Sequence, residues 1–273
     1  MEEKNILVIG GKGKNGRRVV AKLRAKLYNV FSTTRSKERL EENESYFDWN
    51  DSSTYAPALK NINKVYIVHP DTSMPEAQGQ LKELVAQLVQ QPISKVVLLS
   101  GRGQESVEKC EEMLMNSPQE WTIVRSAWFN QNFSEGHFGY GIKSGELAFM
   151  AGPVKEPFVD LDDLTDVVVE ALIHEKHNGK IYEVTGPELF SFEEAVIMIG
   201  SHLDCDIKYK FYPKDEYKYL LLNAGLPAAV ADHMVHAFAE ILDGRNANIG
   251  DGIQQVLGRN PKKFIDFVRS NQF

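Results

Sequence analysis

The stretch NILVIGGKGKNGRRVVAKLRAKL, residues 5–27, decides the fold of this 273-residue chain. Its first residues form the unbroken apolar run expected of a strand buried on both faces of a sheet. After a turn with four glycines, Val19, Val20, Leu23 and Leu27 recur at the three-to-four-residue spacing of an amphipathic helix. The stretch therefore predicts a strand, a glycine-rich turn and a helix, which together make the first unit of a parallel α/β sheet.

The glycines of this turn have the spacing G-x-x-G-x-x-G at Gly10, Gly13 and Gly16. Glycine lets the backbone approach a pyrophosphate closely, and the helix that follows presents free N–H groups and its positive end to that anion. An ordinary loop is the alternative, but the position after the first strand favours a dinucleotide site. The predicted cofactor residues of the turn are Gly10, Gly11, Lys12, Gly13, Lys14, Asn15 and Gly16.

The end of the second predicted strand indicates which dinucleotide is bound. NAD-preferring proteins place an acid there, about 20 residues after the glycines, to bind the ribose 2′-hydroxyl. This chain has Thr33-Thr34-Arg35-Ser36-Lys37 instead. We therefore expect NADP(H) to be preferred over NAD(H), with Arg35 and Lys12 on the 2′-phosphate. Solvated surface cations are the alternative for both residues.

Strand-like and helix-like patterns alternate along the rest of the chain, which predicts a Rossmann-type, doubly wound parallel sheet with helices on both faces. We expect a single domain, with a Rossmann core at about 1–128 and 155–186 and a smaller, mainly helical substrate lobe at about 129–154 and 187–273. The segment 129–157 holds five glycines and two prolines, and this composition favours loops around a site over a regular element. The acids Asp160, Asp162 and Asp163 are typical of a helix start.

Composition excludes several other classes of protein. A net charge of −7 argues against a nucleic-acid-binding surface. Two cysteines and the start Met-Glu-Glu-Lys favour a cytoplasmic protein without disulfides or a signal peptide, and no apolar stretch approaches the ~20 residues of a membrane-spanning helix. The pairs His174/His177 and His233/His236 lack the neighbouring ligands of a metal site, so we predict no metal and interpret these histidines as solvated helix residues.

Several motifs together resemble the NmrA-like atypical short-chain dehydrogenases over nearly the whole chain. They are GGKGKNG (10–16), FDWND (47–51), VYIVHP (65–70), VVLLS (96–100), WTIVRSAWFNQNF (121–133) and PFVDLDDLTDV (157–167). Within that group, FDWND and YEVTGPELFSFEE (182–194) are most similar to the ergot-alkaloid reductases of the festuclavine and agroclavine dehydrogenase type.

The resemblance implies roles for further residues. It implies that Asp48 and Trp49 flank the adenine and that His69 and Pro70 run beside the nicotinamide half of the cofactor. Ser100 closes a strand where related enzymes place a hydroxyl near the nicotinamide, although a turn role is equally compatible. Trp128, Phe129 and Asn132 follow the carboxyl end of a strand, where open α/β sheets bind ligands, and they are candidates for the substrate pocket. Core packing is the alternative for Trp128.

The catalytic pair of the main short-chain dehydrogenases, a Tyr with a Lys four residues later, is absent at each of the ten tyrosines. Lys109 lies in the corresponding region, where we expect it to face solvent. Hydride transfer to an iminium needs no proton delivered to oxygen, so this reaction is compatible with the sequence. Imines, quinones and enones are further candidate acceptors. The catalytic residues themselves stay unassigned.

The sequence therefore predicts an NADPH-dependent reductase that acts on a small organic molecule without a Tyr-Lys pair. The alternative is a regulator of the NmrA type, which senses NADP(H) without turning it over and signals to a protein partner. An isomerase that retains its cofactor is a third, weaker interpretation. Neither a nucleic acid nor a membrane is an expected partner, and a homodimer is left open.

Overall fold

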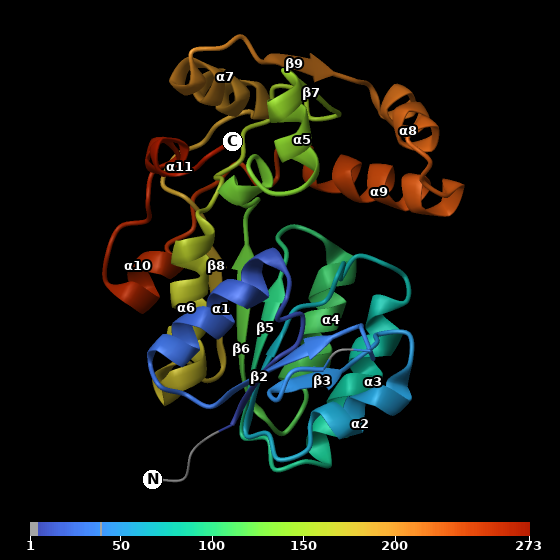
Figure 1. Ribbon diagram of the computed structural model, residues 1–273, viewed down its shortest axis with the longest axis vertical. Helices are drawn as coiled ribbons and strands as arrows, with labels where there is room; N and C mark the ends of the chain where they lie inside the picture. The colour runs from blue at the N-terminus through green and yellow to red at the C-terminus, as the bar shows by residue number, and fades with distance from the viewer. Residues whose placement is uncertain (1–4, 39) are drawn as a thin grey trace.

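The central sheet of the protein contains seven parallel strands. The computed structural model describes residues 5–38 and 40–273, and its main sheet has the order β3-β2-β1-β4-β5-β6-β8 (Figure 1). The strands are β1 (Ile6–Val8), β2 (Val30–Thr34), β3 (Glu44–Tyr46), β4 (Lys64–Ile67), β5 (Lys95–Ser100), β6 (Glu120–Ser126) and β8 (Lys180–Val184). The order reverses between β1 and β4, which is where open α/β sheets bind ligands. The predicted Rossmann-type sheet is confirmed.

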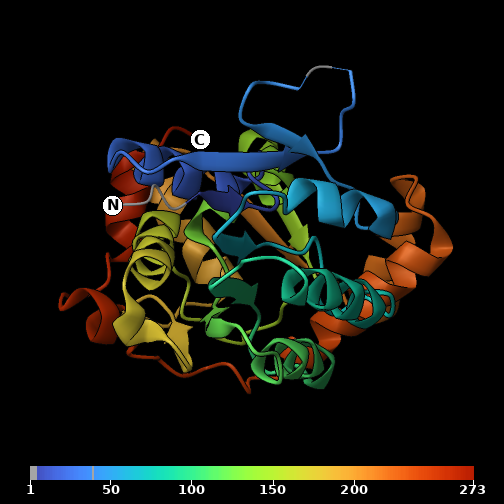
Figure 2. The ribbon, with the colours of Figure 1, turned by 90° about the horizontal axis from the view of Figure 1, so that it is seen from below.

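Helices cover both faces of the sheet, as Figure 2 shows. One face carries α1 (Lys14–Ala25), α6 (Leu161–Ile173) and α10 (Gly252–Leu257), and the other carries α2 (Tyr55–Ala58), α3 (Ala77–Val89) and α4 (Glu105–Met115). Alternate strand residues feed the two cores: Ile6 and Val8 of β1 pack under α1 and α6, whereas Leu7 packs on the side of α3. Short 3-10 turns lie at Ser52–Thr54, Asn130–Asn132 and Glu175–His177.

A smaller lobe lies above the carboxyl edge of the sheet (Figure 1). It consists of α5 (His137–Ser144), β7 (Glu146–Phe149), α7 (Phe192–Leu203), β9 (Lys208–Phe211), α8 (Lys214–Asn223), α9 (Ala228–Ile241) and α11 (Phe264–Ser270). β7 and β9 pair in parallel as a second sheet. The lobe has its own apolar cluster, which is rich in phenylalanine.

One expectation about the lobe is wrong. The glycine-rich segment 129–157 contains a helix, α5, and a strand, β7, where loops were expected. Two of its glycines are needed for close packing: a Cβ on Gly139 would lie 2.9 Å from the Ser134 carbonyl oxygen, and one on Gly141 would lie 2.9 Å from that of Glu146. A third, Gly145, ends the helix with a φ of 82°. Glycine here therefore marks tight contacts and a helix end.

Candidate functional site

The glycine turn brings the backbone of β1 against the start of α1. Gly10 has a φ of 79°, which L-residues rarely adopt, and its N–H donates to the Thr33 hydroxyl at the end of β2. A Cβ on Gly16 would lie 2.2 Å from the Gly10 carbonyl oxygen, and one on Gly11 would lie 2.5 Å from the Ser32 Cβ. No side chain fits at these two positions, so the spacing seen in the sequence reflects a tight cradle.

The N-terminus of α1 is open toward this cradle. Gly13 is its N-cap, no side chain caps it, and its first turn holds no acidic residue. Such a helix end attracts an anion through its free N–H groups and its dipole. The turn therefore fits the pyrophosphate of a dinucleotide on backbone geometry, and Asn15 adds a buried side-chain amide nitrogen without a hydrogen-bond partner.

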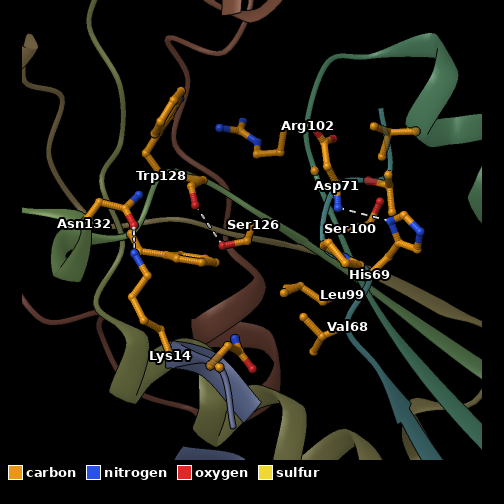
Figure 3. Close-up of a pocket in the computed structure, with 18 of the residues that line it drawn as sticks. Lys14, Val68, His69, Asp71, Leu99, Ser100, Arg102, Ser126, Trp128 and Asn132 are labelled. Atoms are coloured by element: carbon orange, nitrogen blue, oxygen red, sulfur yellow. Dashed lines mark hydrogen bonds between the residues drawn. The ribbon is translucent and has the colours of Figure 1, made fainter. Parts of the chain in front are cut away.

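Lys14 extends from the same turn into the space beneath the lobe. Its ammonium donates to the Asn132 side-chain oxygen at 2.6 Å and to the Glu135 carbonyl oxygen at 3.0 Å (Figure 3). Burial lowers the pKa of Lys14, and the carboxylate of Glu135 opposes that shift. Glu135 also pairs with Arg17 and Arg18, each at 2.6 Å, so the loop after β6 is held against α1.

A cavity of about 530 Å³, here the Arg35 cavity, lies on the β2 side of the turn. It is lined by Ile9, Gly10, Lys12, Gly13, Thr33, Thr34, Arg35, Ser36, Phe47, Trp49, Val68 and Pro70. Arg35 is exposed at its rim, and Lys12 pairs with Glu44 of β3 at 2.8 Å. Asp48 accepts a hydrogen bond from the Asn50 N–H and does not line this cavity, so its adenine role stays a prediction.

A second cavity of about 450 Å³, here the Trp128 cavity, lies between the carboxyl ends of β4, β5 and β6 and the lobe. It shares Gly10, Gly13, Val68 and Pro70 with the Arg35 cavity, so the two meet over the glycine turn. Its remaining lining residues are Lys14, Asn15, Gly16, His69, Asp71, Thr72, Leu99, Ser100, Gly101, Arg102, Gln104, Val107, Ser126, Ala127, Trp128, Phe129, Asn132, Glu156, Ile241 and Asn246. The joined cavities have room for an extended ligand with one end at Arg35 and the other at Trp128.

Trp128 belongs to both the cavity wall and the aromatic cluster of the lobe. Its ring lies 5.3 Å from that of Phe192 and 5.7 Å from that of Phe238, centroid to centroid. The sequence left a pocket role and a packing role open, and the structure combines them. On the opposite side of the cavity, His69 is held by Gln80 at 2.7 Å and by the Asp71 N–H at 3.1 Å, and burial lowers its pKa. His69 is thus a neutral ring at neutral pH.

Ser100 lines the cavity at the end of β5, but its hydroxyl points to a buried carboxylate. It donates to Glu111 of α4, which also accepts hydrogen bonds from the guanidinium of Arg125 at 2.6 and 2.9 Å. Glu111 is 1% exposed. Ser100 therefore belongs to a buried network that joins β5, β6 and α4.

Arg102 follows β5 and links the sheet edge to the chain after α9. Its guanidinium donates to the carbonyl oxygens of Asn246 and Asn248 and pairs with Glu183 at 3.1 Å. Asn246 donates back to the Arg102 carbonyl oxygen. In Figure 3 the guanidinium lies on the same side of the cavity as Trp128. These contacts hold a buried cation in the wall.

Glu156 is a buried acid in this wall. Burial raises its pKa to about 7, and the charge of Arg102 opposes the shift. Because the folded protein binds this proton more tightly than the unfolded chain, Glu156 contributes stability below pH 4.5 that is lost as the pH rises to about 7. We expect the unfolding free energy of the wild type, relative to Glu156→Gln, to fall by roughly 2 to 3 kcal/mol across that range. Urea unfolding from pH 4.5 to 8 measures this difference, and a constant difference would contradict the raised pKa.

The remaining candidates from the sequence have mixed outcomes. Lys109 is solvent-facing as expected and pairs with Glu105 at 2.7 Å, and Asp160 caps α6 as the helix-start interpretation required. The expectation that these histidines are solvated is wrong at two positions. His177 is buried and hydrogen-bonded to the Tyr182 hydroxyl of β8. The half-buried His233 is hydrogen-bonded to Asp71 and Ser73. Sequence spacing could not reveal these contacts, which lie far apart along the chain or depend on the turn.

Within residues 5–38 and 40–273, no helix has the length and apolar character that a membrane crossing requires. Over the same residues, His, Cys, Asp and Glu side chains do not gather in groups of three that could hold a metal ion.

Comparisons with known proteins agree with this geometry. An uncharacterized oxidoreductase of Bacillus subtilis, YesF, is 28% identical over 99% of this chain and 96% of its own. Festuclavine synthase I of Penicillium roqueforti is 25% identical over 96% of each chain. A triphenylmethane reductase of Citrobacter sp., solved as a complex with NADP(H), shares the fold with a TM-score of 0.79 at 17% identity, over 97% of this chain and 99% of that one.

The family described as NAD(P)H-binding matches residues 10–175, from the first glycine of the turn to just beyond the end of α6. This range contains the α1 N-terminus, the Arg35 cavity and most of the sheet side of the Trp128 cavity. The chain therefore belongs to the NAD(P)H-binding family, with relatives that are oxidoreductases and include a festuclavine synthase.

Proposed function

We propose that the protein is an NADPH-dependent reductase of a small organic acceptor. The observation that carries the proposal is the open N-terminus of α1, whose glycine cradle joins the Arg35 cavity to the Trp128 cavity. Bound NADPH supplies a hydride. In this assignment the lobe above the sheet edge is the substrate lobe, and Trp128 with Phe129 forms the wall against which the acceptor packs.

The chain's own residues have three tasks in this function. The backbone of Gly13 to Gly16 holds the pyrophosphate, Arg35 binds the 2′-phosphate, and Trp49 packs beside the adenine. The turn at His69 and Pro70 lies along the cavity floor. The aromatic lobe excludes water from the acceptor, which strengthens every electrostatic contact inside.

NADPH preference is tested with Arg35→Glu. We expect NADPH affinity to fall by about 10- to 100-fold, because an acid replaces the cation at the 2′-phosphate, while NADH affinity stays unchanged. Lys37→Glu is the matched control, since it makes the same charge change two residues away, where Lys37 lies over the Tyr46 ring outside the cavity. Titration calorimetry with both dinucleotides gives the affinities, and equal wild-type affinities would contradict the preference.

Turnover is tested by NADPH consumption with quinone, enone, iminium and dye acceptors. Reproducible consumption by the wild type, lost when NADPH binding is lost, supports the reductase. Tight binding of NADPH without turnover of any acceptor would contradict it and favour the regulator, which senses the cofactor and signals to a protein partner.

A further inference from the structure

Glu156 is placed as a functional acid would be. It lies in the segment between β7 and α6, and its backbone is fixed by two hydrogen bonds with Phe190, at 2.8 and 3.1 Å. Its side chain is 1% exposed and lines the Trp128 cavity, and one carboxyl oxygen has no hydrogen-bond partner. A buried carboxyl without a partner is costly, and such groups concentrate at functional sites.

Arg102 lines the same cavity as Glu156. It is 7% exposed, and its two terminal nitrogens are engaged with Glu183, Asn246 and Asn248. Its Nε has no partner. Both residues line the cavity, and each has one buried polar side-chain atom without a hydrogen-bond partner, Oε1 of Glu156 and Nε of Arg102.

The charges around Glu156 come from several elements. Arg102, after β5, is the cation whose field reaches the carboxyl, and Glu183 of β8 is the ion-pair partner of Arg102. Lys155, beside Glu156, pairs at the surface with Glu194 of α7. Asp71 and Lys14 also line the Trp128 cavity, so charged groups of both signs face the space that Glu156 lines.

We propose that Glu156 is the acid that protonates the acceptor, and that the acceptor is a conjugated carbonyl compound, a quinone or an enone, whose oxygen contacts Glu156 and Arg102. This inference rests on the proposed reductase function and narrows its substrate class. It also assigns a proton donor to a chain that has no Tyr-Lys pair.

The reaction balances with these groups. A carbon of the acceptor system gains a hydride from NADPH, which is oxidised to NADP⁺, and the electron pair of the acceptor's π system moves to its carbonyl oxygen. That oxygen takes the proton as the O–H bond of Glu156 breaks, and the Arg102 N–H stabilises the charge that develops there. The acceptor is reduced by two electrons, and water returns a proton to the Glu156 carboxylate.

The protonation equilibrium of Glu156 agrees with this role. Burial raises its pKa to about 7, so the acid form is well populated at neutral pH. A proton donor is most effective when its pKa lies near the working pH. For the wild type we expect kcat/KM with a quinone to fall as the pH rises above about 7.

The test compares Glu156→Gln with the wild type on two acceptors, menadione and crystal violet. Menadione is a quinone and takes a hydride and a proton, whereas the triarylmethane cation of crystal violet takes a hydride alone. We expect Glu156→Gln to lower kcat/KM for menadione by about 100-fold and to abolish the fall of kcat/KM above about pH 7. For crystal violet, we expect the kcat/KM of this variant to stay within about threefold of the wild-type value. Glu120→Gln is the matched control, because Glu120 is exposed and lies at the end of β6 that is remote from the Trp128 cavity.

The outcomes separate this inference from the function on which it rests. If Glu156→Gln lowers kcat/KM equally for both acceptors, or for neither of them, the proton-donor role is wrong while the reductase function stands. If kcat/KM for menadione rises through pH 7, the carboxylate form is the active one and the inference is overturned. If the wild type reduces crystal violet but not menadione, this inference is overturned while the reductase function stands. If the wild type binds NADPH but reduces none of the quinone, enone, iminium and dye acceptors, the proposed function fails and this inference with it.

A measurement without turnover completes the test. Infrared titration of the wild type should show a protonated carboxyl that disappears near pH 7 and is missing in Glu156→Gln. Should that variant not fold, this titration and the wild-type pH profile decide the question, and a carboxyl already ionised at pH 5 would overturn the role.

Discussion

Gly13→Asp should reduce NADPH affinity by at least about 100-fold while leaving the protein fully folded. Gly13 is the N-cap of α1 with an ordinary extended backbone, φ −72° and ψ 169°, and an added Cβ would meet only the Gly10 carbonyl oxygen, at 3.3 Å. Aspartate is a favoured N-cap, so the unfolding free energy should stay constant or rise by about 1 kcal/mol. Its carboxylate would occupy the same N–H groups as the pyrophosphate and repel it.

The control for this prediction is Gly13→Ala, which adds the Cβ without the charge. We expect it to retain NADPH affinity within about tenfold, and calorimetry together with urea unfolding gives both quantities for each variant. Wild-type affinity in Gly13→Asp would mean that the pyrophosphate does not lie at the N-terminus of α1.

Arg125→Met should destabilise the protein by about 3 to 5 kcal/mol. It removes the guanidinium from Glu111, whose carboxylate is buried and would keep only the Ser100 hydroxyl as a partner. An uncompensated buried charge is among the most costly single defects in a folded protein. Urea unfolding at pH 7 measures the loss, and a wild-type midpoint in this variant would show that water reaches Glu111.

The double variant Glu111→Leu/Arg125→Met separates charge from packing. Replacing both partners of a buried pair by apolar residues is often close to neutral. We therefore expect the double variant to recover at least half of the stability that Arg125→Met loses. If the double variant recovers none of the lost unfolding free energy, the packing of the two side chains, and not their charge, holds β6 against α4.

The sheet and the glycine cradle could be predicted because their signals are local. The apolar run of β1, the glycines and the apolar residues of α1 lie within about 20 consecutive residues. Each of these patterns reflects a constraint on the backbone at the same residues. The parallel, doubly wound sheet followed from the alternation of strand-like and helix-like patterns, since parallel strands need crossover helices.

The wall of the Trp128 cavity could not be predicted in the same way. Arg102 and Asn246 are hydrogen-bonded across 144 residues of sequence, and no periodicity marks either residue. Glu156 reads as one acid in a loop, and only the fold shows that it is buried. The glycines of α5 led to a wrong prediction of loops, because glycine occurs both where helices pack closely and where the chain turns.

The link between Arg102 and the chain around Asn246 has an evolutionary consequence. The cradle at the start of α1 comes from one contiguous stretch, whereas the wall of the Trp128 cavity gathers single residues from distant segments, among them Arg102, Trp128, Glu156 and Ile241. Under the proposed function, substitutions in that wall change which molecule is reduced without altering the turn that binds the cofactor. On this basis, descendants of one gene can acquire new acceptors one residue at a time while every intermediate still binds its dinucleotide.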